Sequence, residues 1–450
     1  MFPVSAPDEL RKMNGHGTTS LPNGGRPWGD PVKHRDPKLP LLESSWLRKV
    51  VFLGTGTSGQ VPAIHCVTSP DFGGCATCAD AVRPGSRNHR GCTSVALVGR
   101  HSHDDDDGST ILIDCGKTFY SSALVHFPRN GIRRLKAVLL THAHADAILG
   151  LDDLRAWTMG SVVQPFVDIY LTEQCMQTVQ GMFPYLVDRS KSTGGGDVGT
   201  LRWHIIDPDR PFWVGTGRSK VEIQPLPVLH GFVNRKDPFW TLGFRIDGFS
   251  YVSDTHSIPE TTTQIMAGSE VIVMDALKMD RHSSHFSFSQ ALSFLASLPP
   301  PPSSTADGGT ASSPPRSNAR LPKLGILTDF THRIEHFATQ ELLDAWRRGL
   351  MDWQVQQAPA PSERAGKGEA GGPRWWDGVW DEADCERRLT IALKGEADKL
   401  SRDTHGSGDG DGDGAADREA AWRAAPHWIP PVAMSWDGMV IEFQQTRKEP

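Results

Sequence analysis

The sequence has no run of about 18 to 20 apolar residues, the length that spans a bilayer. The opening stretch "MFPVSAPDELRKMNGHG" also lacks the apolar core of a secretory signal peptide. Formal net charge is only −6 over 450 residues, and acidic residues cluster at Asp104 to Asp107 and Asp409 to Asp413. The composition therefore disfavours nucleic acid as a partner. We expect a soluble cytoplasmic protein that does not act at a membrane, with a nuclear location left open.

Cysteine is also scarce, at seven residues, too few for a disulfide framework in a chain of this length. Three of the seven, Cys66, Cys75 and Cys78, lie close together in the sequence, which in a reducing compartment favours metal binding over disulfide formation. We interpret the others as ordinary thiols: Cys92, Cys115, Cys175 and Cys385.

Glycine and proline, 45 and 33 residues, gather in a few polar stretches that cannot bury a core. We predict a disordered N-terminal tail over residues 1–47 and one domain over residues 48–445. The predicted disordered insertions in that domain are residues 101–109, 190–199, 300–320 and 354–425, approximately. About 290 residues remain, which is within the range of a single large domain.

Apolar runs of strand length recur between the insertions, among them "SVALVG", "TILIDCG", "VDIYLT", "VIVMDAL" and "LGILTDF". Helical periodicity appears in "ILGLDDLRAW", "EQCMQTVQGMF", "SFSQALSFLASL" and "TQELLDAWRRGL". This mixture predicts a mixed α/β (α+β) fold in which helices cover sheets. The stretch "MSWDGMVIEF" predicts a strand that returns to the domain after the longest insertion.

Metal-binding residue types follow several of the predicted strands. In "VLLTHAHAD", His142, His144 and Asp146 recur at a spacing of two, which places their side chains on one side of an extended backbone. His230 in "LPVLHG" and Asp254 in "YVSDTH" lie at other strand ends. Imidazole and carboxylate groups are typical ligands of divalent transition metals, so these residues predict a metal site.

Together with "FLGTGTSGQVPA", "ILIDCG", "HSSHFSFSQAL" and "WDGMVIEF", these motifs resemble the metallo-β-lactamase superfamily. Within it, the chain resembles the branch of the cyclic-phosphate phosphodiesterase of the bacterial carbon-phosphorus lyase pathway. The resemblance implies a four-layer αββα sandwich with metals at one edge. It also implies ligand roles: His142, His144 and His230 hold a first metal, Asp146 belongs to a second, and Asp254 bridges. By the same resemblance His285 acts on the leaving group.

The same branch carries a structural zinc site of three cysteines and a histidine, which Cys66, Cys75 and Cys78 match. A Cys₃His set forms a closed tetrahedral site. Both His332 and His336 in "ILTDFTHRIEH" could supply the nitrogen. We prefer His332, because it reproduces the spacing from Asp329 that the resemblance implies.

Two positions depart from the branch, which has histidines where this chain has Ala147 and Asp329. One interpretation is a single metal, or a weakly held second one. The other is that Asp329, Asp152 or Asp153 supplies oxygen ligands, which suits manganese or magnesium better than zinc. Asp114 in "LIDCG" is either a residue that orients a ligand histidine or a plain strand-end cap.

The resulting hypothesis is a metal-dependent hydrolase, a phosphodiesterase for a small or cyclic phosphodiester. Its catalytic residues would be Asp146, Asp254 and His285, and its cofactors one or two divalent metals (Zn or Mn) and one structural Zn. The alternatives are a transfer-RNA 3′-end endonuclease, a thioester or lactone hydrolase, and a non-catalytic interaction protein whose second metal site has decayed.

Overall fold

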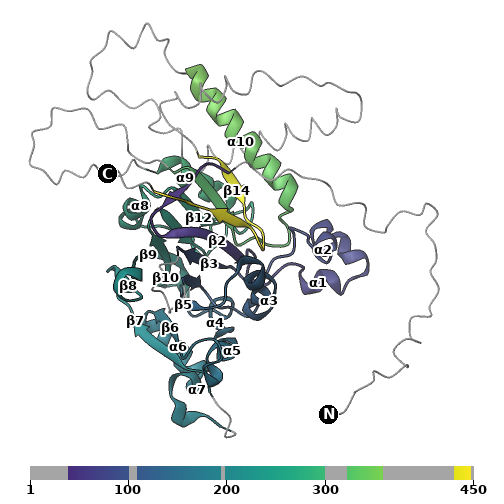
Figure 1. Ribbon diagram of the computed structural model, residues 1–450. Coiled ribbons are helices and arrows are strands. Elements are labelled where there is room, and N and C mark those ends of the chain that lie inside the picture. The colour runs from purple at the N-terminus through teal and green to yellow at the C-terminus, as the bar shows by residue number, and fades with distance from the viewer. Residues whose placement is uncertain (1–38, 101–108, 194–197, 299–321, 358–429, 447–450) are drawn as a thin grey trace, which may run out of the picture. The chain divides into compact units, whose positions relative to one another are not determined.

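The computed structural model of the chain describes residues 39–100, 109–193, 198–298, 322–357 and 430–446 (Figure 1). Most of the predicted tail and insertions, residues 1–38, 101–108, 194–197, 299–321 and 358–429, lie outside the described residues. Everything described belongs to the unit Lys38–Pro450. Among the described residues, no helix is both long and apolar enough to cross a membrane.

Within these residues two seven-stranded sheets form. The first has the order β15-β2-β3-β4-β5-β6-β7. Its strands are β2 (Leu47–Gly54), β3 (Ser94–Gly99), β4 (Thr110–Ile113), β5 (Leu135–Leu139), β6 (Val167–Leu171), β7 (Leu201–Ile205) and β15 (Val440–Glu442). Strands β3, β4 and β5 are buried along their whole length, which explains why their sequences are continuous apolar runs.

The second sheet has the order β14-β13-β12-β11-β10-β9-β8. Its strands are β8 (Phe212–Val214), β9 (Val221–Val233), β10 (Asp237–Ile246), β11 (Phe249–Val252), β12 (Val271–Asp275), β13 (Leu324–Thr328) and β14 (Val432–Met434). Strands β9 and β10 form a long antiparallel hairpin with a bulge between Pro238 and Trp240. A short parallel pair joins β1 (Glu43–Ser44) to β16 (Gln444–Gln445).

The helices are α1 (Ile64–Val67), α2 (Ala76–Ala81), α3 (Phe119–Asn130), α4 (Ala145–Ile148), α5 (Arg155–Thr158), α6 (Glu173–Met182), α7 (Pro184–Val187), α8 (Glu260–Met266), α9 (Phe288–Ser297) and α10 (His336–Gln357). Short 3₁₀ turns occupy Pro70–Gly74, Leu151–Leu154, Met159–Ser161, Arg189–Lys191 and Gly217–Ser219. The predicted helix "ILGLDDLRAW" is therefore broken into α4, a 3₁₀ turn and α5. The three other helical predictions correspond to α6, α9 and α10.

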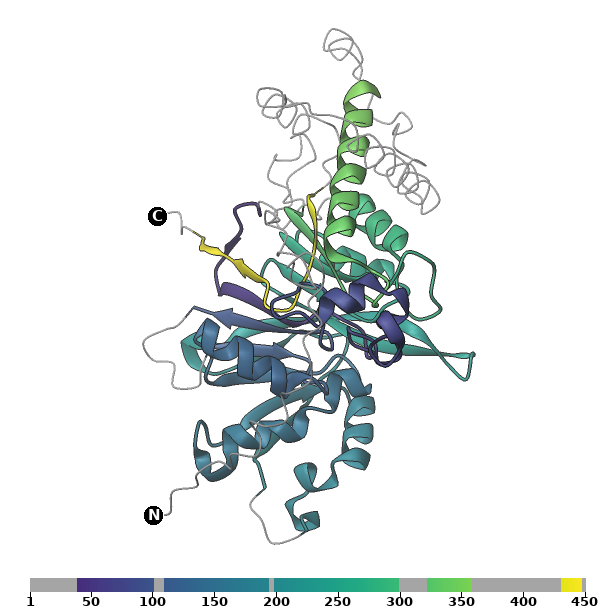
Figure 2. The ribbon, with the colours of Figure 1, turned by 90° about the vertical axis from the view of Figure 1, so that its right-hand side faces the viewer.

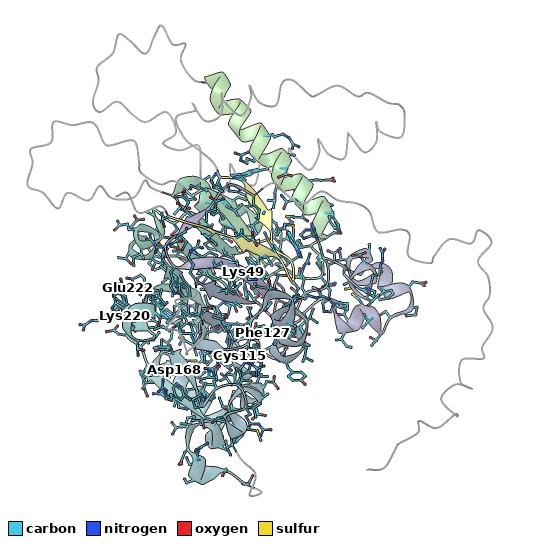
Figure 3. All side chains as sticks on the ribbon, viewed as in Figure 1. Lys49, Cys115, Phe127, Asp168, Lys220 and Glu222 are labelled. Atoms are coloured by element: carbon cyan, nitrogen blue, oxygen red, sulfur yellow. The ribbon has the colours of Figure 1, made fainter. Side chains whose placement is uncertain are left out.

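Three apolar cores define four layers. One core lies between the sheets and includes Phe52, Leu97 and Phe244. A second packs α3, α4 and α6 on the first sheet, and both Phe127 and Cys115 belong to it (Figure 3). A third packs α8, α9 and α10 on the second sheet. In Figure 2 the blue helices and the green helices accordingly lie on opposite sides of the strands. The predicted αββα sandwich is confirmed.

Three predicted boundaries need correction. Residues 39–47 were assigned to the tail, but Leu42 and Leu47 are buried, and Asp247 accepts hydrogen bonds from Ser44 Oγ (2.6 Å) and Ser45 N (2.7 Å). Residues 354–357 were assigned to an insertion, but they continue α10. Lys191 likewise belongs to a 3₁₀ turn that begins before the predicted insertion at residue 190. Polar composition hid these short segments, and the first of them is held by contacts distant in sequence.

The predicted returning strand divides between the two sheets: β14 pairs with β13, and β15 pairs with β2. Between them Asp437 accepts hydrogen bonds from Thr55 Oγ1 (2.8 Å) and Gly91 N (2.6 Å). The C-terminal segment therefore contacts both sheets, and through Asp437 it also contacts Thr55 in the "GTGTSG" turn that follows β2.

Candidate metal centre

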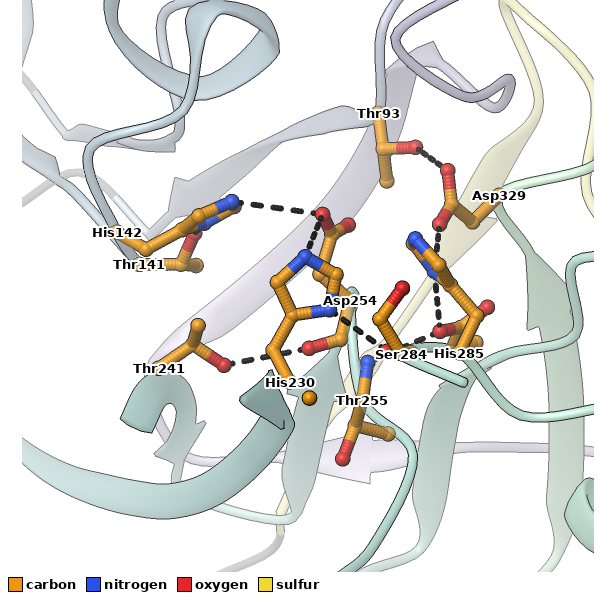
Figure 4. A network of polar contacts seen from close by, with 12 residues as sticks. Thr93, Thr141, His142, His230, Thr241, Asp254, Thr255, Ser284, His285 and Asp329 are labelled. Atoms are coloured by element: carbon orange, nitrogen blue, oxygen red, sulfur yellow. Dashed lines mark hydrogen bonds and ion pairs between the residues drawn. The ribbon is translucent and has the colours of Figure 1, made fainter. Parts of the chain in front are cut away.

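Four of the predicted metal-binding residues come together near the ends of strands from both sheets. His142 and His144 follow β5, His230 lies in β9, and Asp254 follows β11. One nitrogen or oxygen atom from each of these four residues lies within 4.8 Å of those of the others. Figure 4 shows Asp254 between His142 and His230. We call these four residues the first group.

Distances in the first group fit a tetrahedral ion. Asp254 Oδ2 lies 3.4 Å from His142 Nε2 and 3.5 Å from His230 Nε2, both too far for a good hydrogen bond. Ligands at about 2.0–2.1 Å from a tetrahedral ion lie about 3.4 Å apart. His142 Nε2 is buried and has no hydrogen-bond partner among the described residues. The donor set therefore fits a divalent metal of the zinc type.

Hydrogen bonds at the Nδ1 atoms of His142 and His230 orient the Nε2 atoms of both rings toward Asp254. His230 Nδ1 donates to Ser284 O (2.7 Å), and His142 Nδ1 lies 2.8 Å from Thr141 Oγ1. That hydroxyl donates to Asp114 Oδ2 (2.9 Å), which leaves its lone pair for the imidazole. Asp114, held at φ 60°, thus reaches His142 through one hydroxyl, in the orienting position that was one of its two predicted roles.

Burial also prepares the first group for a cation. It lowers the pKa of His142 to about 3, and it lowers the pKa values of His144 and His230. Burial alone would raise the pKa of Asp254, but the surrounding imidazoles outweigh it and lower that pKa to about 2. Neutral imidazoles and an ionised carboxylate are the protonation states in which these side chains bind metals.

A second group, Asp254, His285 and Asp329, shares Asp254 with the first group. His285 Nδ1 lies 2.8 Å from Asp275 Oδ2 and 3.1 Å from Asp329 Oδ2 (Figure 4). Burial alone would lower the pKa of His285, but Asp275 and Asp329 outweigh it and raise the pKa to about 12. Asp329, at φ 71°, also accepts a hydrogen bond from Thr93 Oγ1 (3.0 Å). His285 and Asp329 are therefore held by polar contacts with each other and with Asp275 and Thr93, two residues outside the group.

The capped start of α9 closely follows His285 in the sequence. Ser287 and Gln290 form a capping box at the start of that helix, each side chain bonding the other's backbone N–H. His285 lies two residues before this cap. Only the end of the "HSSHFSFS" stretch enters α9: residues 282–286 are not helical, and His282 and Ser283 are exposed whereas His285 is half-buried.

Other predicted ligands lie outside both groups. Asp146, at the start of α4, is half-buried, and burial raises its pKa to about 6. Gly116 permits the close approach of this segment, because a Cβ there would lie 1.6 Å from Asp146 O. Ala147 packs into the core with Ile148. Asp152 accepts a hydrogen bond from Tyr185 Oη (2.9 Å), and neither it nor Asp153 joins the groups.

The cysteine cluster forms a third group. Cys66, Cys75, Cys78 and His332 each place one ligand atom within 4.8 Å of the others, whereas His336 packs against Trp436. His332 Nδ1 lies 3.5 Å from both Cys66 Sγ and Cys75 Sγ. A tetrahedral zinc with sulfur at about 2.3 Å and nitrogen at about 2.0 Å gives a separation of about 3.5 Å. These residues therefore fit a closed zinc site.

Two residues that contact the histidines of the site were not predicted from the sequence. Asp275 ends β12, so the same strand-end rule that found Asp254 could have found it. Phe239 stacks on His144 with ring centroids 5.2 Å apart and lies 5.9 Å from the ring of His230. It occupies the bulge of β10. No sequence signal marks a bulge of this kind, because it depends on the register with β9.

Comparisons with known proteins found one family model and several similar proteins. The model of the β-lactamase superfamily domain matches residues 109–303. A crystal structure of a diphosphatase from the PhnP family is similar over 88% of this chain and 98% of its own, with a TM-score of 0.51 and 19% identity. Zinc-bound PqqB from Methylobacterium extorquens covers 88% of this chain and 100% of its own, with a TM-score of 0.44 and 16% identity.

An octanoyltransferase from Porphyromonas gingivalis is 27% identical over 253 residues, which cover 56% of this chain and 44% of that protein. The chain thus spans less than half of that relative. Residues 109–303 thus match the β-lactamase superfamily domain model, and the two sheets with their covering helices share the metallo-β-lactamase sandwich fold.

Proposed function

We propose that this chain is a metal-dependent hydrolase of small or cyclic phosphodiesters. The observation that carries the proposal is the first group, in which the separations of 3.4 and 3.5 Å from Asp254 to His142 and His230 fit an ion and not a hydrogen bond. We assign zinc to this position, because octahedral ions would draw such ligands to about 3.0 Å of one another. The cysteine group would hold a second, structural zinc.

The metal and the side chains around it would have separate roles in the reaction. When bound, the metal would lower the pKa of water and offset charge on the phosphate oxygens. His285 has Nδ1 committed to Asp275 and Asp329, so Nε2 remains to meet a substrate and donate a proton to the departing oxygen. Asp254 faces both groups and fixes their spacing. Asp146 is a further carboxylate beside the site.

The rival activities make different demands. A transfer-RNA endonuclease needs cationic side chains along a path for the RNA backbone. A thioester hydrolase expels a thiolate, which is a weaker base than an alkoxide and so depends less on a proton donor such as His285. A non-catalytic protein has no need of a buried imidazole with Nε2 facing a carboxylate. The proposed diesterase uses both groups, which is why we prefer it.

The test is turnover by the full chain of ethyl 4-nitrophenyl phosphate, a thioester, and a transfer-RNA precursor, after loading with zinc. We expect hydrolysis of the phosphodiester above the other two. Efficient cleavage of only the thioester or the RNA would replace the proposal by the corresponding rival. No turnover of any of the three by zinc-loaded protein would favour the non-catalytic alternative.

A further inference from the structure

A cavity of about 740 Å³ adjoins one side of the first group. It reaches His142 and His144 and is bounded by β9, β10 and the start of α6. Its size is that of pockets that enclose a drug-sized organic group. A phosphodiester linkage alone would fill a small part of it. The cavity therefore has room for a large substituent of the substrate.

The walls of this cavity are mostly apolar, contributed by Ile206, Pro208, Pro227, Phe239, Trp240 and Leu242. Apart from the two histidines, the charged residues that line it are Glu173 and Asp209, both acidic. An additional phosphate or carboxylate on the substrate would meet these two carboxylates without a cation among the lining residues. The chemistry of the walls thus selects a neutral apolar group and disfavours polyanions such as nucleic acid.

The position of the cavity identifies which substituent it receives. His285 and Asp329 do not line it, and in Figure 4 they lie on the other side of Asp254 from His142, which does line it. In an in-line displacement the leaving oxygen must face the proton donor, His285. The group that enters the cavity is then the one that stays on phosphorus.

We infer that the cavity binds the retained substituent of the phosphodiester, and that this substituent is neutral and apolar. The inference rests on the proposed function. In the reaction, the P–O bond to the leaving group breaks and a P–O bond to water oxygen forms. His285 gives a proton to the departing oxygen, the attacking water loses one to solvent, and the retained substituent keeps its bond to phosphorus.

Three alkyl 4-nitrophenyl phosphodiesters test this inference. They share the 4-nitrophenolate leaving group and differ in the retained alkyl group, which is ethyl, hexyl or 5-carboxypentyl. For zinc-loaded full chain we expect kcat/KM to rise at least about tenfold from ethyl to hexyl, since each buried methylene adds up to about fourfold. The 5-carboxypentyl ester should lose most of that gain. Calorimetric binding of hexyl phosphate should show a negative heat-capacity change, which does not depend on turnover.

Variants locate the effect. Trp240→Ala removes a cavity wall and should reduce the hexyl-to-ethyl ratio severalfold. Trp213→Ala is the matched control, because Trp213 is 50% exposed against 47% for Trp240 and does not line this cavity. The double variant Glu173→Gln with Asp209→Asn should reduce the difference in kcat/KM between the hexyl and 5-carboxypentyl esters.

The outcomes separate the two proposals. Failure to hydrolyse any of the three esters would overturn the phosphodiesterase function itself. Equal turnover of all three, with no change in the ratio in Trp240→Ala, would leave that function standing and overturn the assignment of the cavity.

Discussion

The two halves of the metal centre share Asp254 but differ in how their members are spaced. In the first group, histidine nitrogens lie 3.4 and 3.5 Å from the carboxylate. In the second, His285 Nδ1 lies 3.1 Å from Asp329 and also 2.8 Å from Asp275, which is outside the group. The separations in the first group leave space for an ion, whereas the His285 imidazole of the second group is already engaged by two carboxylates.

This difference bears on Ala147 and Asp329, the two positions at which the resemblance implies histidines. An added carboxylate beside His285 favours the protonated imidazole, so the second group contains a positive charge that belongs to the chain. A divalent ion there would have to displace that proton. We therefore expect one tightly held metal at the catalytic centre and a fixed proton donor in place of the second.

The largest effect should come from removing a member of the first group. His142→Ala or Asp254→Asn should lower kcat/KM by at least about 10³-fold and abolish zinc binding at this centre, since the ion supplies both the nucleophile and charge stabilisation. His282→Ala is the matched control, because His282 lies beside His285, at 5.3 Å between ring centroids, but belongs to neither group. Activity of His142→Ala near the wild-type level would refute the first group as the catalytic centre.

The cysteine group offers a reference site that needs its metal for folding. Cys75→Ser with Cys78→Ser should release one zinc per chain and lower the thermal unfolding midpoint by at least about 10 °C, because a structural zinc contributes its binding energy to folding. Cys175→Ser, at a buried cysteine outside the group, controls for loss of a thiol. Unchanged zinc content in the double variant would mean that these cysteines bind no metal.

His285 should matter in proportion to the basicity of the leaving group. His285→Asn is expected to slow alkyl phosphodiesters by about 10²–10⁴-fold and 4-nitrophenyl esters much less, because a general acid helps most when the departing oxygen holds its proton strongly. Rates with a series of leaving groups of rising pKa provide the measurement. Equal losses across the series would make His285 a structural or binding residue.

Asp114 should have a smaller effect, since it acts through Thr141. Asp114→Asn keeps the size of the side chain but weakens the chain of hydrogen bonds to His142, and we expect zinc affinity at the first group to fall about 10- to 100-fold. Competition with a chelator of known affinity measures this. If affinity is unchanged while stability falls, Asp114 is a strand-end cap and not an orienting residue.

These residues also indicate what the sequence could and could not predict. The residues of the first group and of the cysteine group were predicted from strand ends or local spacing, and both sets meet in the structure, although His230 lies within β9 and not at its end. The partners of His285 depend on β12 and β13 lying side by side, which no local pattern specifies. Phe239 depends on a register shift. The burial of Ala147 could not be predicted from the sequence either, because burial at one position depends on the packing of the whole core.

The smallest effect concerns the binding of a second metal ion at the catalytic centre, in the second group. Zinc titration of the wild-type chain should end at two ions, one in the cysteine group and one in the first group. The double variant Ala147→His with Asp329→His supplies two imidazoles and should bind a third, weaker zinc.

Ala147 is only 2% exposed, so its replacement by a larger ring should also cost about 1–3 kcal/mol of stability. Ala147→Phe with Asp329→His matches that ring without its nitrogens, and should show the loss of stability without the added ion. Three tightly bound zinc ions in the wild type would contradict the comparison between the two halves, because some other residue would then complete the second metal site.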